Sequence, residues 1–328
     1  MQFLSNSITI LLGFLLLVAV TDSEPTLRKA FSYKADDFAV AQIVNLHLLD
    51  NTPEYFEARL NIPVCDDKLC APVFAKIKWD LAGNYLAFDT IEGNPLTKFD
   101  HKRFSGDDYQ KLDQILKDKN SILQSLSKND LVDKSIRVKA STVDAVTGAT
   151  PATIKQAIVE GAVYSSFTLW HFVNGAIGDS IRAFTLKNYS LAIACKLLDS
   201  ENFESQLFAL KQFKQQELSE NFDRLLPLIE KSSPIVRAYF INKLPLPFAE
   251  KQKNSNLFEA YKRLDNYSKS IFSDRIISSK EIAVVFAPLI FDHMNAFDEK
   301  QQQKLISGIQ KLGLPELNKQ IKEYFSAH

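Results

Sequence analysis

The sequence has no excess of either charge, because its 39 Lys and Arg residues are matched by 39 Asp and Glu residues. A nucleic-acid-binding protein normally carries a basic excess or a basic stripe, and this chain shows neither. We therefore expect no nucleic-acid partner. The sequence also lacks G-x-S-x-G, H-E-x-x-H and a phosphate loop ending in Gly-Lys-[ST]. These absences leave no catalytic residue and no metal site to assign, so the question of enzymatic activity stays open.

Cysteine is scarce, with three residues in the whole chain. Cys65 and Cys70 are close enough to bridge around a tight loop, and the main interpretation is a structural disulfide. A redox-active dithiol is an alternative, although the pair lacks the two-residue spacing of thioredoxin-like sites. Metal binding by two thiolates without a nearby histidine is a weaker alternative. Cys195 has apolar neighbours on both sides, which predicts a buried free thiol.

Long hydrophobic runs are also few, and the main one extends from Ile8 to Val20. This run is shorter than the roughly 20 residues that span a bilayer and suits the apolar core of a secretory signal peptide. We assign residues 1–21 to that signal and expect an exported protein, periplasmic or otherwise extracytoplasmic and associated with a membrane. An uncleaved membrane anchor is the alternative.

The remaining chain is long enough for two domains of ordinary size, and its 46% hydrophobic content is typical of globular proteins. Residues 22–44 are interpreted as a polar lead-in segment that includes a short helix. Alternating apolar residues predict a strand over 55–64 and a hairpin over 73–91, with its turn at 82–84. Ser105 and Asp108 form a capping box that begins a helix, and 135–142 is a short strand.

Strand signals nearly vanish after residue 179, which predicts an all-α domain over 179–328 after an α+β domain over 45–178. We expect helices at 181–198, 203–214, 219–231, 234–244, 257–271, 280–291, 299–312 and 315–325. The stretch "SSPIVRAYFINKLP" resembles a HEAT-type repeat helix, but no regular period is legible. An irregular helical bundle is the alternative.

The stretch "VDAVTGATPAT", residues 143–153, places one of only ten glycines between two threonines. Pro151 suits the first position of a helix, so Thr150 is the expected N-cap of a helix that ends near Gly175 and Gly178. Such a helix start could hold a phosphate through backbone N–H groups, threonine hydroxyls and Lys155. A well-capped helix without a ligand is the simpler interpretation of this local physics.

The pattern Asp144-x-x-Thr147-Gly148-Ala149-Thr150 resembles the D-x-x-[ST]-G-A-[TS] flavinylation motif of the FMN-binding domain family. That family includes subunits of the membrane-bound sodium-pumping quinone reductase and Rnf complexes. In it, a flavin transferase joins the FMN phosphate to the last threonine by a phosphoester bond. The resemblance covers roughly residues 45–175. Two departures are Pro151 after the acceptor and Thr147 in place of the commoner serine.

The resemblance implies that Thr150 carries FMN covalently. Asp144 would belong to the signature that the transferase reads, while Thr147, Gly148 and Ala149 shape the turn. It also implies an electron-transfer flavoprotein or oxidoreductase component, served by a membrane-associated redox protein. Trp79, Tyr85, Phe88 and Trp170 are candidates to stack on the ring, although each is better explained as core. The alternative function is an exported helical-repeat interaction or scaffold protein whose first domain lacks the cofactor.

Overall fold

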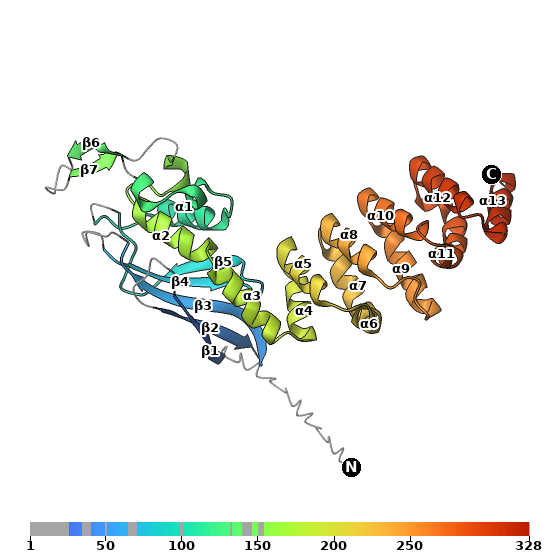
Figure 1. Cartoon of the computed structure of the whole chain (residues 1–328), viewed down its shortest axis with the longest axis horizontal. Coiled ribbons are helices and arrows are strands. Elements are labelled where there is room, and N and C mark those ends of the chain that lie inside the picture. Colours follow the sequence, from blue (N-terminus) through green and yellow to red (C-terminus); the bar gives the residue numbers. More distant parts are fainter. Residues whose placement is uncertain are drawn as a thin grey trace, which may run out of the picture.

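The computed structural model describes residues 26–34, 41–49, 51–64, 71–98, 101–131, 133–139, 146–149 and 154–327. Their arrangement is an antiparallel sheet with covering helices, followed by a long stack of helices that reaches the C-terminus (Figure 1). This order confirms the prediction of an α+β part followed by an all-α part. Among the described residues, no helix combines the length and apolar character that crossing a membrane requires.

The sheet has five strands in sequential order, each antiparallel to its neighbour. The strands are β1 Thr26–Tyr33, β2 Gln42–Leu49, β3 Thr52–Ile62, β4 Val73–Trp79 and β5 Tyr85–Thr90. The short helix predicted within 22–44 is wrong, because β1 and the start of β2 occupy the described part of that segment. The lead-in segment therefore supplies the first strand of the sheet. Cross-strand hydrogen bonding of β1 to β2, and of β2 to β3, decides this conformation over local propensity.

Alternating residues bury one face of the sheet, as the period of two requires. Along β4 the buried side chains are Val73, Ala75, Ile77 and Trp79, and the residues between them are half-buried. The predicted hairpin is confirmed, with β4 and β5 joined at the expected turn. Gly83 occupies that turn with a φ of +77°, a left-handed conformation that favours glycine.

Three helices cover the buried face of the sheet and its β5 edge. They are α1 Gly106–Lys117, α2 Val163–Asn174 and α3 Ile177–Lys187 (Figure 1). The predicted capping box of Ser105 and Asp108 is present at the start of α1. The Trp79 indole N–H donates to the carbonyl of Val173 at 3.2 Å, which ties β4 to α2. Short 3-10 turns η1 Ile122–Ser125 and η2 Lys128–Asp130 follow α1.

The helix predicted to begin at Pro151 begins twelve residues later, at Val163. Between Ile154 and Ala162 the chain forms a 3-10 turn, η3 Lys155–Ala157, and then a turn at Gly161 with a φ of +76°. A left-handed residue cannot continue a right-handed helix, so α2 has to begin after Gly161. Gly175 ends α2 as predicted, whereas Gly178 lies inside α3 rather than ending a helix.

The C-terminal part consists of helices and one 3-10 turn, η4 Met294–Ala296. The helices are α4 Leu191–Leu198, α5 Phe203–Gln212, α6 Gln215–Glu220, α7 Phe222–Lys231, α8 Pro234–Lys243, α9 Lys251–Arg263, α10 Asn266–Ile276, α11 Lys280–Asp292, α12 Glu299–Lys311 and α13 Pro315–Ala327. The predicted segment 181–198 is divided between α3 and α4, because Ser190 caps a new helix start. The segment predicted over 257–271 is likewise divided between α9 and α10, at the Asp265 N-cap.

These helices stack in two layers. Contacts between neighbours link α5, α8, α10 and α12 in one layer and α4, α7, α9, α11 and α13 in the other. The helices of the first layer begin at Phe203, Pro234, Asn266 and Glu299, in steps of 31, 32 and 33 residues. The structure therefore reveals a near-regular period that the sequence pattern conceals.

The sheet and the helical stack share one continuous apolar core, which extends from Val44 in β2 to Leu305 in α12. Buried polar contacts reinforce the junction. The Asp80 carboxylate accepts hydrogen bonds from the backbone N–H groups of Ala82 and Asn84, at 2.9 and 2.8 Å, and from the Ser205 hydroxyl of α5. The Asn84 amide donates to the Ser205 hydroxyl at 2.7 Å. The β4–β5 turn is thus bonded directly to the first helical pair.

Candidate functional site

The flavinylation-like motif lies at a two-stranded hairpin that is separate from the main sheet (Figure 1). Its strands are β6 Asp133–Lys139 and β7 Val146–Ala149, which pair antiparallel with Val138 opposite Thr147. Thr147, Gly148 and Ala149 therefore lie on a strand. The strand predicted over 135–142 is confirmed as far as Lys139. Asp144 and Thr150 lie outside the described residues, as do Cys65 and Cys70.

The chain that follows the motif is fixed to the rest of the sheet domain. Ile154, Ile158 and Val159 are buried, and the Val159 N–H donates to the Ser166 hydroxyl at 3.0 Å. The ammonium group of Lys111 in α1 donates to the carbonyl of Lys155 at 3.3 Å. The motif thus precedes a buried anchor rather than a helix start. Both interpretations of a helix that starts at Pro151, capped without a ligand or holding a phosphate non-covalently, therefore lose their structural basis.

The aromatic residues considered for flavin stacking are part of the core. Trp79 has no exposed surface and Trp170 is 3% exposed. The Trp170 indole N–H donates to the carbonyl of Asp118 at 2.8 Å. Burial and a hydrogen bond to Asp113 raise the pKa of Tyr85 far above its ordinary value. Phe88 is half-buried, with its ring centroid 6.2 Å from that of Tyr109.

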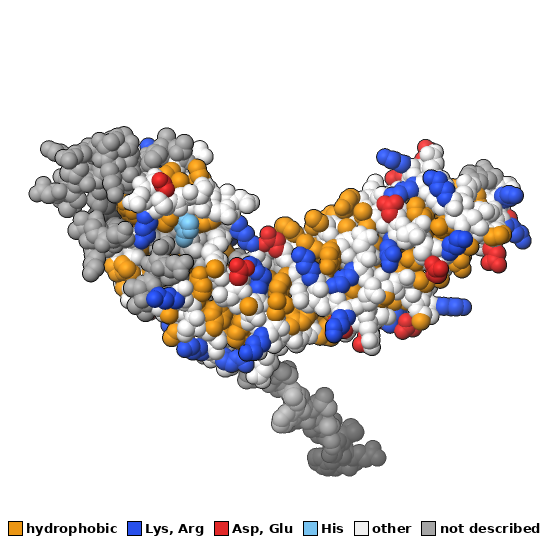
Figure 2. Space-filling model, viewed as in Figure 1, with side chains coloured by type: hydrophobic (Ala, Val, Ile, Leu, Met, Phe, Trp, Pro, Cys, Tyr) orange, Lys and Arg blue, Asp and Glu red, His pale blue; other side chains and the backbone are white. Residues whose placement is uncertain are grey.

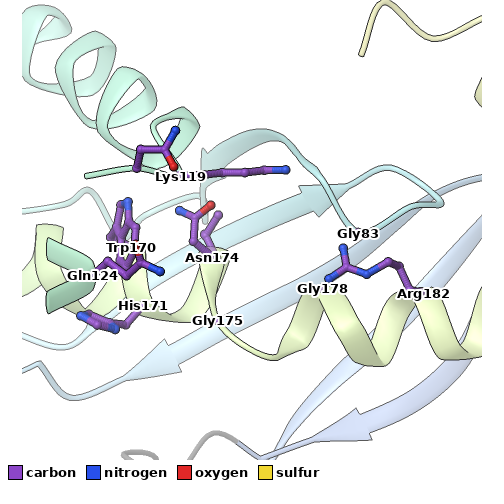
Figure 3. A pocket seen from close by; sticks show the side chains of 11 residues that line it. Gly83, Lys119, Gln124, Trp170, His171, Asn174, Gly175, Gly178 and Arg182 are labelled. Atoms are coloured by element: carbon purple, nitrogen blue, oxygen red, sulfur yellow. The ribbon is translucent and has the colours of Figure 1, made fainter. Parts of the chain in front are cut away.

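A cavity of about 430 Å³ opens beside these residues, between the β4–β5 turn and the junction of α2 with α3 (Figure 3). It is a feature that the sequence interpretation missed. Its lining includes Lys119 from the end of α1, Arg182 from α3 and three glycines, Gly83, Gly175 and Gly178. The sequence predicts these glycines only as turn and helix-end residues. Their approach to the two cations depends on tertiary packing, which no local pattern encodes.

Side chains of α2 position the connection that carries Lys119. The Asn174 amide donates to the carbonyl of Leu116 at 3.1 Å, and the His171 Nε2 lies 2.9 Å from the carbonyl of Leu123. The Asn174 and Trp170 bonds use the carbonyl groups of Leu116 and Asp118, which the end of α1 leaves without intrahelical partners, whereas Leu123 belongs to η1. The lysine therefore projects from a connection that is fixed on both sides.

A second polar cluster lies on the outward face of the sheet. The rings of His47 and Tyr55 stack with centroids 4.3 Å apart, and the His47 Nε2 is 3.7 Å from the Glu57 carboxylate. Burial lowers the pKa of His47 below its ordinary value, against the opposing charge of Glu57. Within the described residues, neither ring nitrogen of His47 has a hydrogen-bond partner.

Cys195 is a free thiol, as predicted, but it is half-buried rather than buried. Burial raises the pKa of this thiol, although the charge of Arg224 acts against the shift. A raised pKa disfavours the reactive thiolate. Burial at Cys195 therefore disfavours the thiolate form of this residue of α4.

Comparison with known proteins gives no match to this chain, whether with protein-family models, curated sequences or solved structures.

Proposed function

We propose that this chain is an exported flavoprotein that carries FMN on Thr150 through a phosphoester bond and transfers electrons. The observation that carries the proposal is the sequence pattern from Asp144 to Thr150, which matches the flavinylation motif at every defined position. A membrane-associated redox protein would exchange electrons with the flavin, and a flavin transferase would attach it. The flavin supplies the redox chemistry, and the protein sets its position and surroundings.

The local structure is compatible with modification of Thr150. The strand β7 ends at Ala149, directly before the acceptor, and its last residues are Gly148 and Ala149, which have little or no side chain. A modifying enzyme has to reach the acceptor hydroxyl, and small neighbouring residues leave room for that approach. Covalent attachment also needs no helix N-terminus. The late start of α2 therefore removes support from non-covalent phosphate binding and leaves the covalent proposal intact.

The test is the intact mass of the full chain coexpressed with a flavin transferase. We expect an increase of one FMN minus water, with yellow colour that survives denaturation. Thr150→Val should abolish both signals because it removes the hydroxyl but keeps the side-chain shape. Thr147→Val is the matched control, since it removes the other motif hydroxyl and should still be modified. An unmodified wild-type mass under these conditions would reject the proposal.

A second candidate function is an interaction scaffold, and the helical stack favours it. The two-layer arrangement resembles helical-repeat proteins, which bind partners along extended surfaces. Its period near 32 residues is shorter than the roughly 40–47 residues of HEAT-type repeats. Large apolar residues occupy equivalent helix starts in three successive repeats, Phe203, Ile235 and Tyr267, exposed by 46%, 54% and 55%. Figure 2 shows apolar side chains at the surface over α5 and α8. In the flavoprotein proposal, the same surface would bind the redox partner.

The two candidates make different predictions for a Phe203→Ser/Ile235→Ser/Tyr267→Ser variant. As a scaffold, the protein would lose partner binding while remaining colourless throughout. If the protein is a flavoprotein, the variant would keep covalent flavin on Thr150, and only its rate of electron exchange with the partner would decrease.

A further inference from the structure

We infer that the cavity beside the β4–β5 turn binds a small organic anion through a carboxylate or phosphate group. This site is distinct from the flavinylation motif, and its chemistry requires no flavin. The inference therefore stands or falls independently of the proposed function. It rests on the charge of the lining, the exposed backbone at the helix junction and the volume of the cavity.

The lining contains two cationic side chains and no carboxylate. The Lys119 ammonium donates to the Asn84 amide oxygen at 2.6 Å and pairs with Glu204. Arg182 donates to the carbonyl of Ala82 at 3.1 Å and pairs with Asp179. Both acidic partners lie outside the lining, and their side chains are 46% and 75% exposed. Each cation is thus held in place by one neutral oxygen and one exposed carboxylate.

Figure 3 shows how the two cations enclose the space. Lys119 extends from the end of α1 along the cavity towards the turn that contains Gly83, while Arg182 lies beside Gly83 and Gly178. The neutral groups Gln124 and Asn174 lie on the side opposite Arg182. An anion between these groups would meet positive charge at one end and amide groups at the other.

The backbone of the α2–α3 junction adds positive potential. Ala176 is the N-cap of α3 and offers no side-chain acceptor to the first N–H groups of that helix. The Gly178 N–H donates to the Gly175 carbonyl at 3.4 Å, and the Asp179 carboxylate of the first turn is paired with Arg182. The other N–H groups of the first turn and the dipole of this 11-residue helix favour an anion. Gly175 and Gly178, which flank this start, line the cavity and leave the backbone uncovered.

The glycines cannot be replaced without closing or distorting this arrangement. A Cβ on Gly83 would lie 2.5 Å from the carbonyl oxygen of Gly178, and a Cβ on Gly175 would lie 2.4 Å from that of His171. The turn and the helix junction therefore meet backbone to backbone. This close approach brings Arg182 next to the turn and leaves an open cavity of about 430 Å³, within the range of small-molecule sites.

The test measures binding of succinate and of glycerol 3-phosphate to the full chain by isothermal titration calorimetry. The uncharged probes are succinamide and glycerol. We expect saturable binding of at least one anion at millimolar concentration and no binding of the uncharged molecules. The anion that binds more tightly identifies the preferred head group, carboxylate or phosphate.

Three variants locate the site. Gln124→Glu adds a negative charge to the lining at an exposed side chain and should weaken anion binding by about tenfold or more. Gln114→Glu makes the same change at an exposed position of α1 outside the lining and should leave binding unchanged. Glu204→Gln removes the competing carboxylate from Lys119 and should strengthen binding.

The inference is overturned if neither anion binds saturably to the wild-type chain at millimolar concentration. It is also overturned if Gln124→Glu and Gln114→Glu weaken binding equally, because the anion would then respond to overall charge rather than to this cavity. Unchanged circular dichroism of each variant confirms that the comparison is between folded proteins.

Discussion

At the scale of single residues, the hydroxyl group of Ser205 connects the sheet to the helical stack by hydrogen bonds. It has no exposed surface, donates to the Asp80 carboxylate and accepts from the Asn84 amide. In Ser205→Ala, the Asp80 carboxylate and the Asn84 amide stay buried, and each loses one hydrogen bond. Loss of such a bond destabilises a fold by about 1–3 kcal/mol. We expect that decrease in the free energy of unfolding, measured by urea denaturation.

The matched control is Ser180→Ala in α3. Ser180 is half-buried, and its hydroxyl makes a solvent-exposed hydrogen bond to the carbonyl of Ala176, at 3.3 Å. This variant should remain within about 0.5 kcal/mol of the wild type, as surface substitutions usually do. Equal effects of the two substitutions would show that the buried network does not stabilise the junction.

Asp265, the N-cap of α10, makes stability depend on pH at the acidic end. Partial burial alone would raise its pKa, but hydrogen bonds from Ser268 and the Arg237 guanidinium together lower the pKa to about 2. Its unfolded pKa is about 3.9. A lowered folded pKa means that the carboxylate stabilises the fold above the unfolded value, and that this contribution is lost as pH falls towards about 2.

The corresponding variant is Asp265→Asn, compared with the wild type in urea denaturation at pH 5 and at pH 2. The stability difference between the two proteins should be largest at pH 5 and should shrink at pH 2, where the wild-type carboxylate also becomes protonated. Arg237→Gln removes one cause of the shift and should reduce the same difference. A gap between wild type and Asp265→Asn that does not change with pH would contradict this account.

At the scale of elements, the hairpin of β4 and β5 was predictable because its information is local. Alternating residues define its buried face, and the turn at Gly83 falls between the two strands. The capping box at Ser105 was predictable for the same reason. The first strand was not, because β1 forms only by pairing with β2, and its own residues are mostly exposed. Non-local hydrogen bonds decide the conformation there.

The candidate site shows the same division. The turn expected at Thr147, Gly148 and Ala149 is wrong, because these residues form strand β7 by pairing with β6. The motif itself could be recognised from the sequence, because it is a local pattern. The cavity could not, because Lys119 and Arg182 are 63 positions apart and meet only through the close contact of Gly83 with Gly178. The prediction of a helix start at Pro151 is wrong, although the apolar residues from Ile154 to Ala162 have helical spacing. The left-handed turn at Gly161 overrides that pattern.

Gly161→Ala tests which conformation the segment before α2 prefers. In the structure, alanine would occupy a left-handed conformation, which costs about 1–2 kcal/mol, and its Cβ would lie 3.3 Å from the Lys98 side chain. We therefore expect destabilisation of that size in urea denaturation. Gly106→Ala is the control, because its Cβ would meet no atom within 4 Å and its φ is not left-handed. If Gly161→Ala instead stabilised the protein, a continuous helix from Pro151 would be supported.

At the scale of the whole molecule, the continuous core and the polar junction imply that both parts unfold together. The chain offers separate probes for them, because its two tryptophans, Trp79 and Trp170, both lie in the sheet part, whereas most helices lie in the stack. Tryptophan fluorescence and far-ultraviolet circular dichroism should therefore report the same urea midpoint in the wild type. Coincidence of such probes is the standard test of a single cooperative transition.

Weakening the polar contacts between the sheet part and the helical stack should make the two parts unfold in separate transitions. The variant Ser205→Ala/Glu204→Gln removes two buried hydrogen bonds and the ion pair with Lys119, and it leaves the shared apolar core intact. The part with the smaller intrinsic stability should then unfold at a lower urea concentration, so that fluorescence and dichroism midpoints differ. Ser180→Ala combined with Gln114→Glu is the control and should keep a single midpoint. If the junction variant still unfolded in one step with the wild-type midpoint, the shared apolar core alone would couple the two parts, and the polar contacts at Asp80 would contribute nothing to their cooperation.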